Sequence, residues 1–377
     1  MSPATAQPAT DRSPGLLPHE RLQHLLDALS RSGYECIGPK LRDGAILYEH
    51  IDSVAELPLG VAVEQGPGSY RVDMTDSRRR FGWANGPQAI KPFLFAPREI
   101  LWRATQREDG TLVFDARPPA CKPLAVIGAR ACDLAALALQ DKHFLGGTCP
   151  DPGYARRRDG LFIVAVHCSH PAQTCFCAST GDGPRATSGF DIALAELDDG
   201  FVAESGSDRG AAILDGLHLS SATTAQLVAA EEQGRHSSEV QRRALPGRNL
   251  QASLFANLEH PRWQEVAERC LSCGNCTSVC PTCFCHSEAE VPKLDGDSSL
   301  HEREWDSCFT QGHSYIHGFT VRPDTRTRYR QWLTHKLGGW HAQYGRSGCV
   351  GCGRCISWCP VGIDITEEAH AICGPQP

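Results

Sequence analysis

The sequence predicts an α+β protein, in which an N-terminal mixed α/β domain precedes an α-helical, cysteine-rich domain. Two short apolar runs, LAVIGA at 124–129 and LFIVAVH at 161–167, predict the α/β part, because the first is followed at once by a helical pattern. The cysteines predict the second part, since seven of the 19 precede residue 249 and twelve follow it. We therefore expect a disordered tail over 1–17, an α/β domain over 18–248 and the cysteine-rich domain over 249–377.

Composition and charge argue against several classes of protein. A chain of 377 residues is long enough for two domains with their own cores. A net charge of −7 argues against a nucleic-acid partner. No apolar run reaches the roughly 18 residues of a membrane span, and the polar N-terminus MSPATAQPATDRSPG lacks the apolar centre of a secretory signal. We expect a cytoplasmic protein with no membrane span.

Local patterns predict the elements of the α/β domain. Residues 18–33 carry leucines at helical spacing on one face, which indicates an amphipathic helix. Asp-Gly pairs at 43–44 and 199–200 each separate two apolar stretches, so both are expected to form hairpin turns. The stretch from about 205 to 248 ends in RRALPGRN, which we interpret as a linker.

Two cysteine runs with the same spacing dominate the C-terminal domain. Each has the form C-x2-C-x2-C-x3-C-P, which is the ligand pattern of proteins that hold a pair of [4Fe-4S] clusters. Zinc sites need four ligands, usually as separated pairs, and disulfide frameworks are typical of small secreted chains. The fourth cysteine of such a run normally binds the other cluster. We therefore predict a first thiol set of Cys270, Cys273, Cys276 and Cys359, and a second thiol set of Cys349, Cys352, Cys355 and Cys280.

The spacer between the runs indicates the type of cluster domain. It contains 68 residues between Cys280 and Cys349, too many for the short hairpin-linked repeat of small β-type ferredoxins. Helical spacing is visible over 325–337, and another helix is expected to begin at Pro261. An α-helical ferredoxin-type dicluster domain is the resulting prediction.

Four cysteines of the α/β domain form a third thiol set: Cys132, Cys168, Cys175 and Cys177. Cys132 and Cys168 follow the two apolar runs, and open α/β sheets bind ligands beyond the carboxyl ends of their strands. The set could hold a third [4Fe-4S] cluster or a zinc ion, or it could consist of free buried thiols.

Other thiols and imidazoles have no obvious role in the sequence. Cys283, Cys285 and Cys308 are expected to be small buried hydrophobes more often than ligands. His313, His317 and His335 are expected to be solvated or hydrogen-bonded rather than metal-bound.

Several longer phrases carry a family resemblance. The stretches GARACDLAALALQDKHFL, DPGYARRR, HCSHPAQTCFCASTGDGP, CPTCFCHSEAE, WDSC and RYRQWLTHKLGGWHAQYGRSGCVGCGRCISWCPVGID resemble the β subunit of cytoplasmic NAD(P)-linked [NiFe] hydrogenases (sulfhydrogenases). They are equally similar to the electron-transfer subunit of anaerobic sulfite reductase. The resemblance covers about residues 18–370, and the third thiol set matches cysteine positions of the family.

The resemblance implies an electron-transfer subunit rather than a catalytic one. It implies transfer between a flavin- and NAD(P)-binding partner and a catalytic hydrogenase or reductase subunit. No strand–GxGxxG–helix unit is present in the sequence, and no catalytic residue is predicted. An iron–sulfur redox sensor is the alternative from another class, but it predicts a DNA-binding element, and no basic helix or helix-turn-helix pattern is visible.

Overall fold

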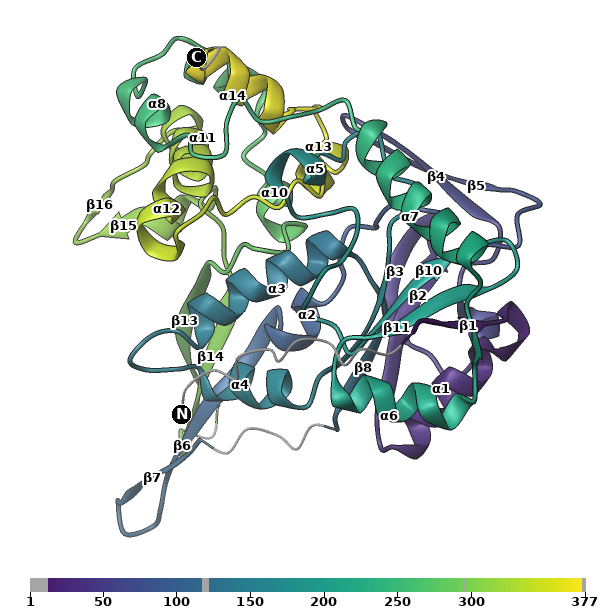
Figure 1. Cartoon of the computed structure of the whole chain (residues 1–377). Coiled ribbons are helices and arrows are strands. Elements are labelled where there is room, and N and C mark those ends of the chain that lie inside the picture. The colour runs from purple at the N-terminus through teal and green to yellow at the C-terminus, as the bar shows by residue number, and fades with distance from the viewer. Residues whose placement is uncertain (1–12, 117–121, 295, 375–377) are drawn as a thin grey trace.

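The structure is a computed structural model that describes residues 13–116, 122–294 and 296–374. An eight-stranded sheet forms the centre of the N-terminal part (Figure 1). Its members are β1 (Gly15–Leu17), β2 (Glu35–Arg42), β3 (Ala45–His50), β8 (Leu124–Ala129), β9 (Phe162–Val166), β10 (Ile192–Glu196), β11 (Phe201–Ser205) and β12 (Ser220–Ser221). They are ordered β12-β1-β11-β10-β9-β8-β2-β3, and β2, β8, β9 and β10 run parallel to one another.

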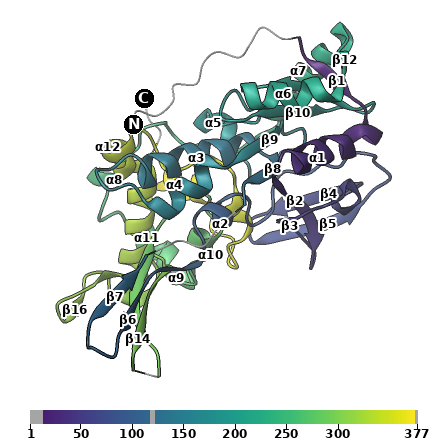
Figure 2. The same ribbon diagram turned by 90° about the horizontal axis from the view of Figure 1, so that it is seen from below.

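Helices cover both faces of this sheet. Ala125 and Ile127 of β8 belong to the core formed with α1 and α6, whereas Val126 belongs to the core formed with α3 and α4. This alternation gives three layers and confirms the predicted mixed α/β architecture (Figure 2). The helices of this part are η1 (His19–Arg21), α1 (Leu22–Arg31), η2 (Val54–Glu56), α2 (Lys91–Leu94), α3 (Ala131–Phe144), α4 (Pro152–Asp159), α5 (Cys177–Thr180), α6 (Asp208–Leu217) and α7 (Thr224–Glu239).

Both predicted hairpins and the amphipathic helix are present. Strands β2 and β3 pair through Arg42 and Ala45, and the two turn residues Asp43 and Gly44 have φ angles of 48° and 74°. Positive φ at both positions is what a two-residue turn of type I′ requires, so the Asp-Gly pair determines this connection. Strands β10 and β11 form the second hairpin, and the four leucines of α1 are buried.

The prediction of a disordered tail over residues 1–17 is partly wrong. Gly15–Leu17 forms β1, which pairs with both β11 and β12, while residues 1–12 lie outside the described part of the chain. A three-residue strand flanked by Pro14 and Pro18 has no local signature. It exists because partners almost 200 residues away in the sequence satisfy its backbone groups.

A second sheet combines strands from both halves of the sequence. Its order is β13-β14-β6-β7, and all three pairings are antiparallel. Because β14 pairs directly with β6, residues on the two sides of the expected boundary at 248/249 share one sheet. The strands are β6 (Arg98–Gln106), β7 (Leu112–Asp115), β13 (His286–Pro292) and β14 (Ser298–Trp305).

Helices supply most of the remaining C-terminal structure, and their apolar side chains form a separate core. The expected helices at 261 and 325–337 are present as α9, and as α11 continued by the π-helical turn η4. The segments are α8 (Gln251–Ala256), α9 (Arg262–Arg269), α10 (Asn275–Ser278), η3 (Gln311–Ser314), α11 (Thr325–Thr334), η4 (His335–Gly339), α12 (Trp340–Tyr344), α13 (Arg354–Ser357) and α14 (Ile365–Cys373). Two small hairpins complete the fold: β4 (Val61–Gly66) with β5 (Ser69–Met74), and β15 (Tyr315–Ile316) with β16 (Phe319–Thr320).

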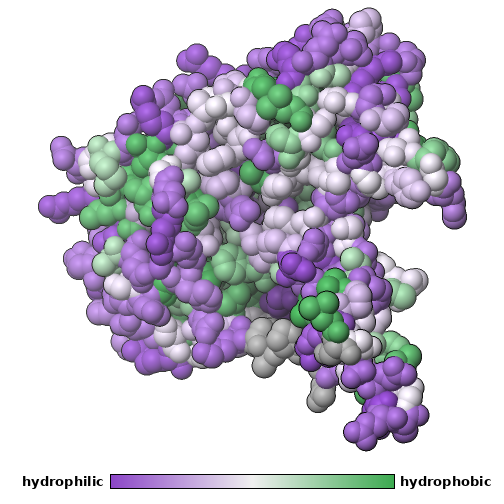
Figure 3. Space-filling model, turned by 180° about the vertical axis from the view of Figure 1, so that it is seen from behind, coloured by the Kyte–Doolittle hydropathy of each residue, from purple (hydrophilic) through white to green (hydrophobic). Residues whose placement is uncertain are grey.

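One face of the molecule is mostly hydrophilic (Figure 3). Figure 3 shows hydrophobic residues on this face in separate small groups among hydrophilic ones. Among the described residues, no helix combines the length and the apolar character that crossing a bilayer requires.

Candidate metal centres

The two cysteine runs follow the same local backbone path. Ser272 and Gly274 have φ angles of 52° and 76° in the first run, and the corresponding Gly351 and Gly353 have 64° and 74° in the second. Each run then enters a four-residue helix, α10 or α13. The path directs equivalent amides at equivalent thiols: Ser272 N lies 3.4 Å from Cys270 Sγ, and Gly351 N lies 3.5 Å from Cys349 Sγ. The runs are therefore a structural repeat as well as a sequence repeat.

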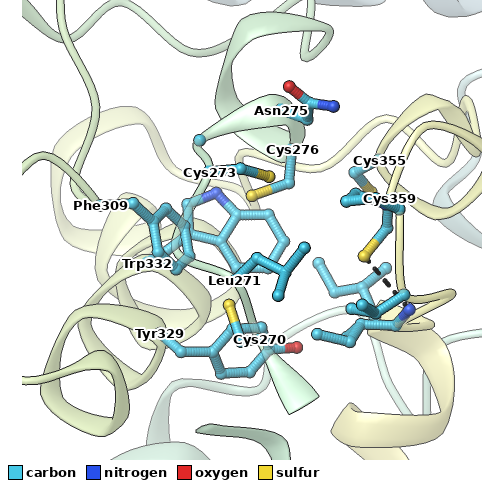
Figure 4. A pocket seen from close by; sticks show the side chains of 15 residues that line it. Cys270, Leu271, Cys273, Asn275, Cys276, Phe309, Tyr329, Trp332, Cys355 and Cys359 are labelled. Carbon is cyan, nitrogen blue, oxygen red and sulfur yellow. Dashed lines mark hydrogen bonds between the residues drawn. The ribbon is translucent and has the colours of Figure 1, made fainter.

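The first thiol set converges on one apolar pocket. Figure 4 shows its sulfurs facing a space that is also lined by Leu271, Tyr329 and Trp332. Cys276 interacts electrostatically with the other three members, and burial followed by these interactions raises its pKa well above the ordinary value of a thiol. Ile363 N donates to Cys359 Sγ over 3.3 Å, which holds the cysteine of the second run in this pocket.

The second thiol set lies next to the first. Burial raises the pKa of Cys349 to about 12, and Cys352 and Cys280 add to the shift. Cys355 interacts with all three of these thiols and also with Cys276 of the first set. The structure thus brings the fourth cysteine of each run to the other run, and the two sets are neighbours.

Lys336 places a positive charge beside the second set. It lies in the π-helical turn η4, is 4% exposed, and donates to Thr282 Oγ1 over 2.8 Å. Burial disfavours its ammonium form, but the nearby Cys280 and Cys283 sulfurs raise the pKa of Lys336 above its ordinary value. A hydrogen bond from Cys283 and the Lys336 ammonium both lower the pKa of Cys280. Lys336 therefore stabilises negative charge at this site.

Replacement of Lys336 by methionine is expected to lower the midpoint potential of a cluster held by the second set. For scale, two unit charges about 6 Å apart at an effective dielectric constant of about 20 interact by about 3 kcal/mol, which is on the order of 100 mV for one electron. The shift is negative because the reduced cluster carries more negative charge. A redox titration followed by electron paramagnetic resonance measures it. Lys293→Met, at the exposed end of the β13–β14 hairpin, is the control, and equal potentials in both variants would contradict the assignment.

The third thiol set lies at the carboxyl edge of the central sheet. Cys132 lies in the first turn of α3 after β8, Cys168 follows β9, Cys175 lies in the next loop, and Cys177 is the first residue of α5. All four are less than 9% exposed. Cys175 and Cys177 each interact electrostatically with Cys168, and Cys132 interacts with Cys177. Burial raises the pKa of Cys177 to about 12.

The third set packs directly against the second run. Phe176 N donates to Gly351 O over 2.8 Å, and Asn85 Nδ2 donates to Cys352 O over 2.9 Å. A Cβ atom on Gly351 would lie 2.6 Å from Cys177 Cα, so only glycine fits this contact. Cys352 also interacts with Cys132, Cys175 and Cys177. The second set is therefore a neighbour of both the first set and the third.

Two buried arginines, Arg130 and Arg354, lie beside the third set. Arg354 of the second run forms an ion pair of 2.8 Å with Asp133 of α3, and both side chains are almost fully buried. Arg130 donates to the backbone oxygens of Phe81 and Trp83. Arg354 lowers the pKa of Cys132 and Arg130 lowers that of Cys168, although burial raises both more strongly. These cations favour thiolates and the negative charge of a thiolate-ligated cluster.

The three sets fit iron–sulfur chemistry. Desolvation keeps most of these thiols protonated when no cation is bound. Bound iron would supply the positive charge that stabilises their thiolate forms. The surrounding apolar side chains and amide donors are the features that tune cluster potentials.

Comparisons with known proteins agree with this geometry. Residues 269–363 match the family model of the 4Fe-4S dicluster domain, a range that contains both cysteine runs. Sulfhydrogenase 2 subunit beta of Pyrococcus furiosus is 31% identical over 277 residues, which cover 73% of this chain and 79% of that protein. The chain belongs to the sulfhydrogenase β-subunit family. No solved structure matches it.

Membership of the sulfhydrogenase β-subunit family supports [4Fe-4S] clusters and an iron–sulfur electron-transfer role. Two charged side chains near the thiols, Lys336 and Arg354, were not predicted from the sequence as parts of the site. Lys336 was visible only as part of a helical pattern, although a lysine on the same face as Tyr329, Trp332 and Leu333 signals a buried charge. Arg354 stands between two cysteines of the second run, and its burial depends on Asp133, which is more than 200 residues away in sequence.

Proposed function

We propose that this chain is the iron–sulfur electron-transfer subunit of a cytoplasmic hydrogenase (sulfhydrogenase) complex. In the proposal it relays electrons between a flavin- and NAD(P)-binding partner and a catalytic subunit. The first, second and third thiol sets are each assigned one [4Fe-4S] cluster, which supplies one-electron chemistry. The name of the Pyrococcus furiosus relative supports a hydrogenase-type complex.

The observation that carries this proposal is that the second thiol set adjoins both of the others. Cys355 of the second set interacts electrostatically with Cys276 of the first set. Cys352 of the second set interacts in the same way with Cys132 of the third set. Adjoining sets suit electron transfer through the protein, because they extend from the exposed Cys273 of the first set to the buried thiols of the third. The helices α8 to α14, with the β13–β14 hairpin inserted, support an α-helical ferredoxin-type dicluster domain.

Counting iron and acid-labile sulfide in anaerobically purified protein tests the cofactor assignment. We expect about twelve of each per chain, because each [4Fe-4S] cluster contributes four. About eight of each would contradict the third cluster but leave the other two. Zinc without sulfide in all three sets would contradict the whole assignment.

The partners decide between the hydrogenase and the sulfite- or sulfur-reductase alternatives. Affinity purification of the tagged full chain from its native cells is expected to retain two partners, one with a nickel–iron centre and one with a flavin. Retention of a sirohaem-containing partner would instead identify the chain as the electron-transfer subunit of a sulfite reductase. A chain isolated without redox partners, but bound to DNA, would favour the sensor alternative.

A further inference from the structure

Two thiols and one imidazole outside the three thiol sets meet at one point. The ligand atoms of Cys285, Cys308 and His313 all lie within 4.8 Å of one another. No local pattern groups them, because 27 positions separate Cys285 from His313. The β13–β14 hairpin brings them together: Cys285 immediately precedes β13, Cys308 follows β14, and His313 lies in η3.

The spacing of the sulfurs fits two ligands on one ion. Cys285 Sγ lies 3.9 Å from Cys308 Sγ. Two Zn–S bonds of about 2.3 Å in tetrahedral geometry place their sulfurs about 3.8 Å apart. A disulfide bond would need about 2.05 Å. The ligands of a [4Fe-4S] cluster bind different iron atoms, so their sulfurs must stand farther apart than this pair.

The surroundings of His313 are those of a metal-bound histidine. His313 Nδ1 lies 2.5 Å from Asp306 Oδ2. A carboxylate at one ring nitrogen fixes the ring, which is the arrangement around most metal-ligating histidines, and the ring also hydrogen-bonds the Cys285 thiol. Asp306 is itself held, because its amide donates to Cys285 O over 2.9 Å and its Oδ1 accepts from Ser307 N over 2.7 Å.

A pocket adjoins one of the three ligands, Cys285. Cys285 and Asp306 line a pocket together with Cys283, Ser307 and Thr310. Cys283 hydrogen-bonds Cys280 of the second thiol set, and it does not belong to the group whose ligand atoms all lie within 4.8 Å of one another. A solvent molecule can complete a tetrahedral set from this pocket.

We propose that Cys285, Cys308 and His313 bind one zinc ion, separate from the iron–sulfur clusters. Two thiolates and one imidazole are donors that zinc prefers. The ion would join the residues on either side of the β13–β14 hairpin, where His286 pairs with Trp305. It would fix this hairpin, and therefore the antiparallel sheet that contains β6, to the helices of the dicluster domain.

Metal analysis of the full chain tests this site independently of the clusters. Anaerobically purified protein is expected to contain about one zinc per chain in addition to iron, and X-ray absorption at the zinc edge should show two sulfur ligands at about 2.3 Å and one nitrogen ligand at about 2.0 Å. Cys308→Ala and His313→Ala are each expected to lose the zinc while iron and acid-labile sulfide stay constant. His317→Ala is the matched control, because His317 is exposed on the neighbouring β15–β16 turn.

Asp306→Asn provides a milder variant that keeps all three ligands. It is expected to weaken zinc binding by about 10- to 100-fold in competition with a chelator. Three results would overturn the proposal: wild-type protein without zinc, zinc that survives both ligand substitutions, or iron and sulfide that fall together with zinc. The absorption spectrum of the wild-type protein decides the question even where a variant does not fold.

Discussion

Replacement of Cys132 by serine is expected to remove about four iron atoms and four sulfides per chain, the content of one [4Fe-4S] cluster. Cys132 is 7% exposed at the start of α3 and interacts with Cys177 of the same thiol set. Its loss leaves three thiolates in a desolvated site, which is too few for a cluster with four cysteine ligands. Iron and sulfide assays on anaerobic protein measure the change, and Cys168→Ala should give the same deficit.

Cys36→Ser is the matched control for Cys132→Ser. Cys36 is 5% exposed on β2, and it packs among apolar side chains of the sheet core rather than among thiols. It therefore tests what the loss of a buried sulfur does to folding alone. Full iron content is expected in this variant. If Cys132→Ser also keeps its full iron, or if it loses zinc in place of iron, the third cluster is refuted.

The sequence predicted those parts of the fold that depend on neighbouring residues. The leucines of α1, the apolar strands β8 and β9, and the Asp-Gly turns carry their information within a few positions, and all are present. Strand β1 and the pairing of β6 with β14 depend on partners almost 200 residues away. No local pattern encodes such partners, which explains why both were missed.

The same distinction between local patterns and distant partners applies to the candidate site. The repeated spacing places three thiols of each run on one loop, so the runs themselves could be recognised from the sequence. The spatial order of the three sets could not, because it follows from the packing of Phe176 on Gly351 and from the ion pair of Arg354 with Asp133. The meeting of Cys285, Cys308 and His313 likewise depends on a hairpin whose pairing partner is β6.

Replacement of Gly351 by alanine is expected to separate the third set from the second run. Its left-handed φ of 64° costs alanine about 1–2 kcal/mol. The new Cβ would also lie 2.6 Å from backbone atoms of Phe176 and Cys177, and backbone cannot move aside as a flexible side chain does. We expect a lower thermal midpoint and a loss of about four to eight irons, depending on whether one or both adjoining clusters fail to assemble.

Gly345→Ala separates the backbone strain of a positive φ from the steric contact of the new Cβ. Gly345 has a φ of 75°, close to that of Gly351, but a Cβ there meets nothing within 4 Å. This control therefore carries the same backbone strain without the steric contact. It is expected to lower the midpoint of anaerobic thermal unfolding slightly and to retain all its iron. If Gly351→Ala has the same thermal midpoint and the same iron content as Gly345→Ala, the contact between the second and third thiol sets is not required for cluster assembly. That result would contradict the argument from adjoining sets.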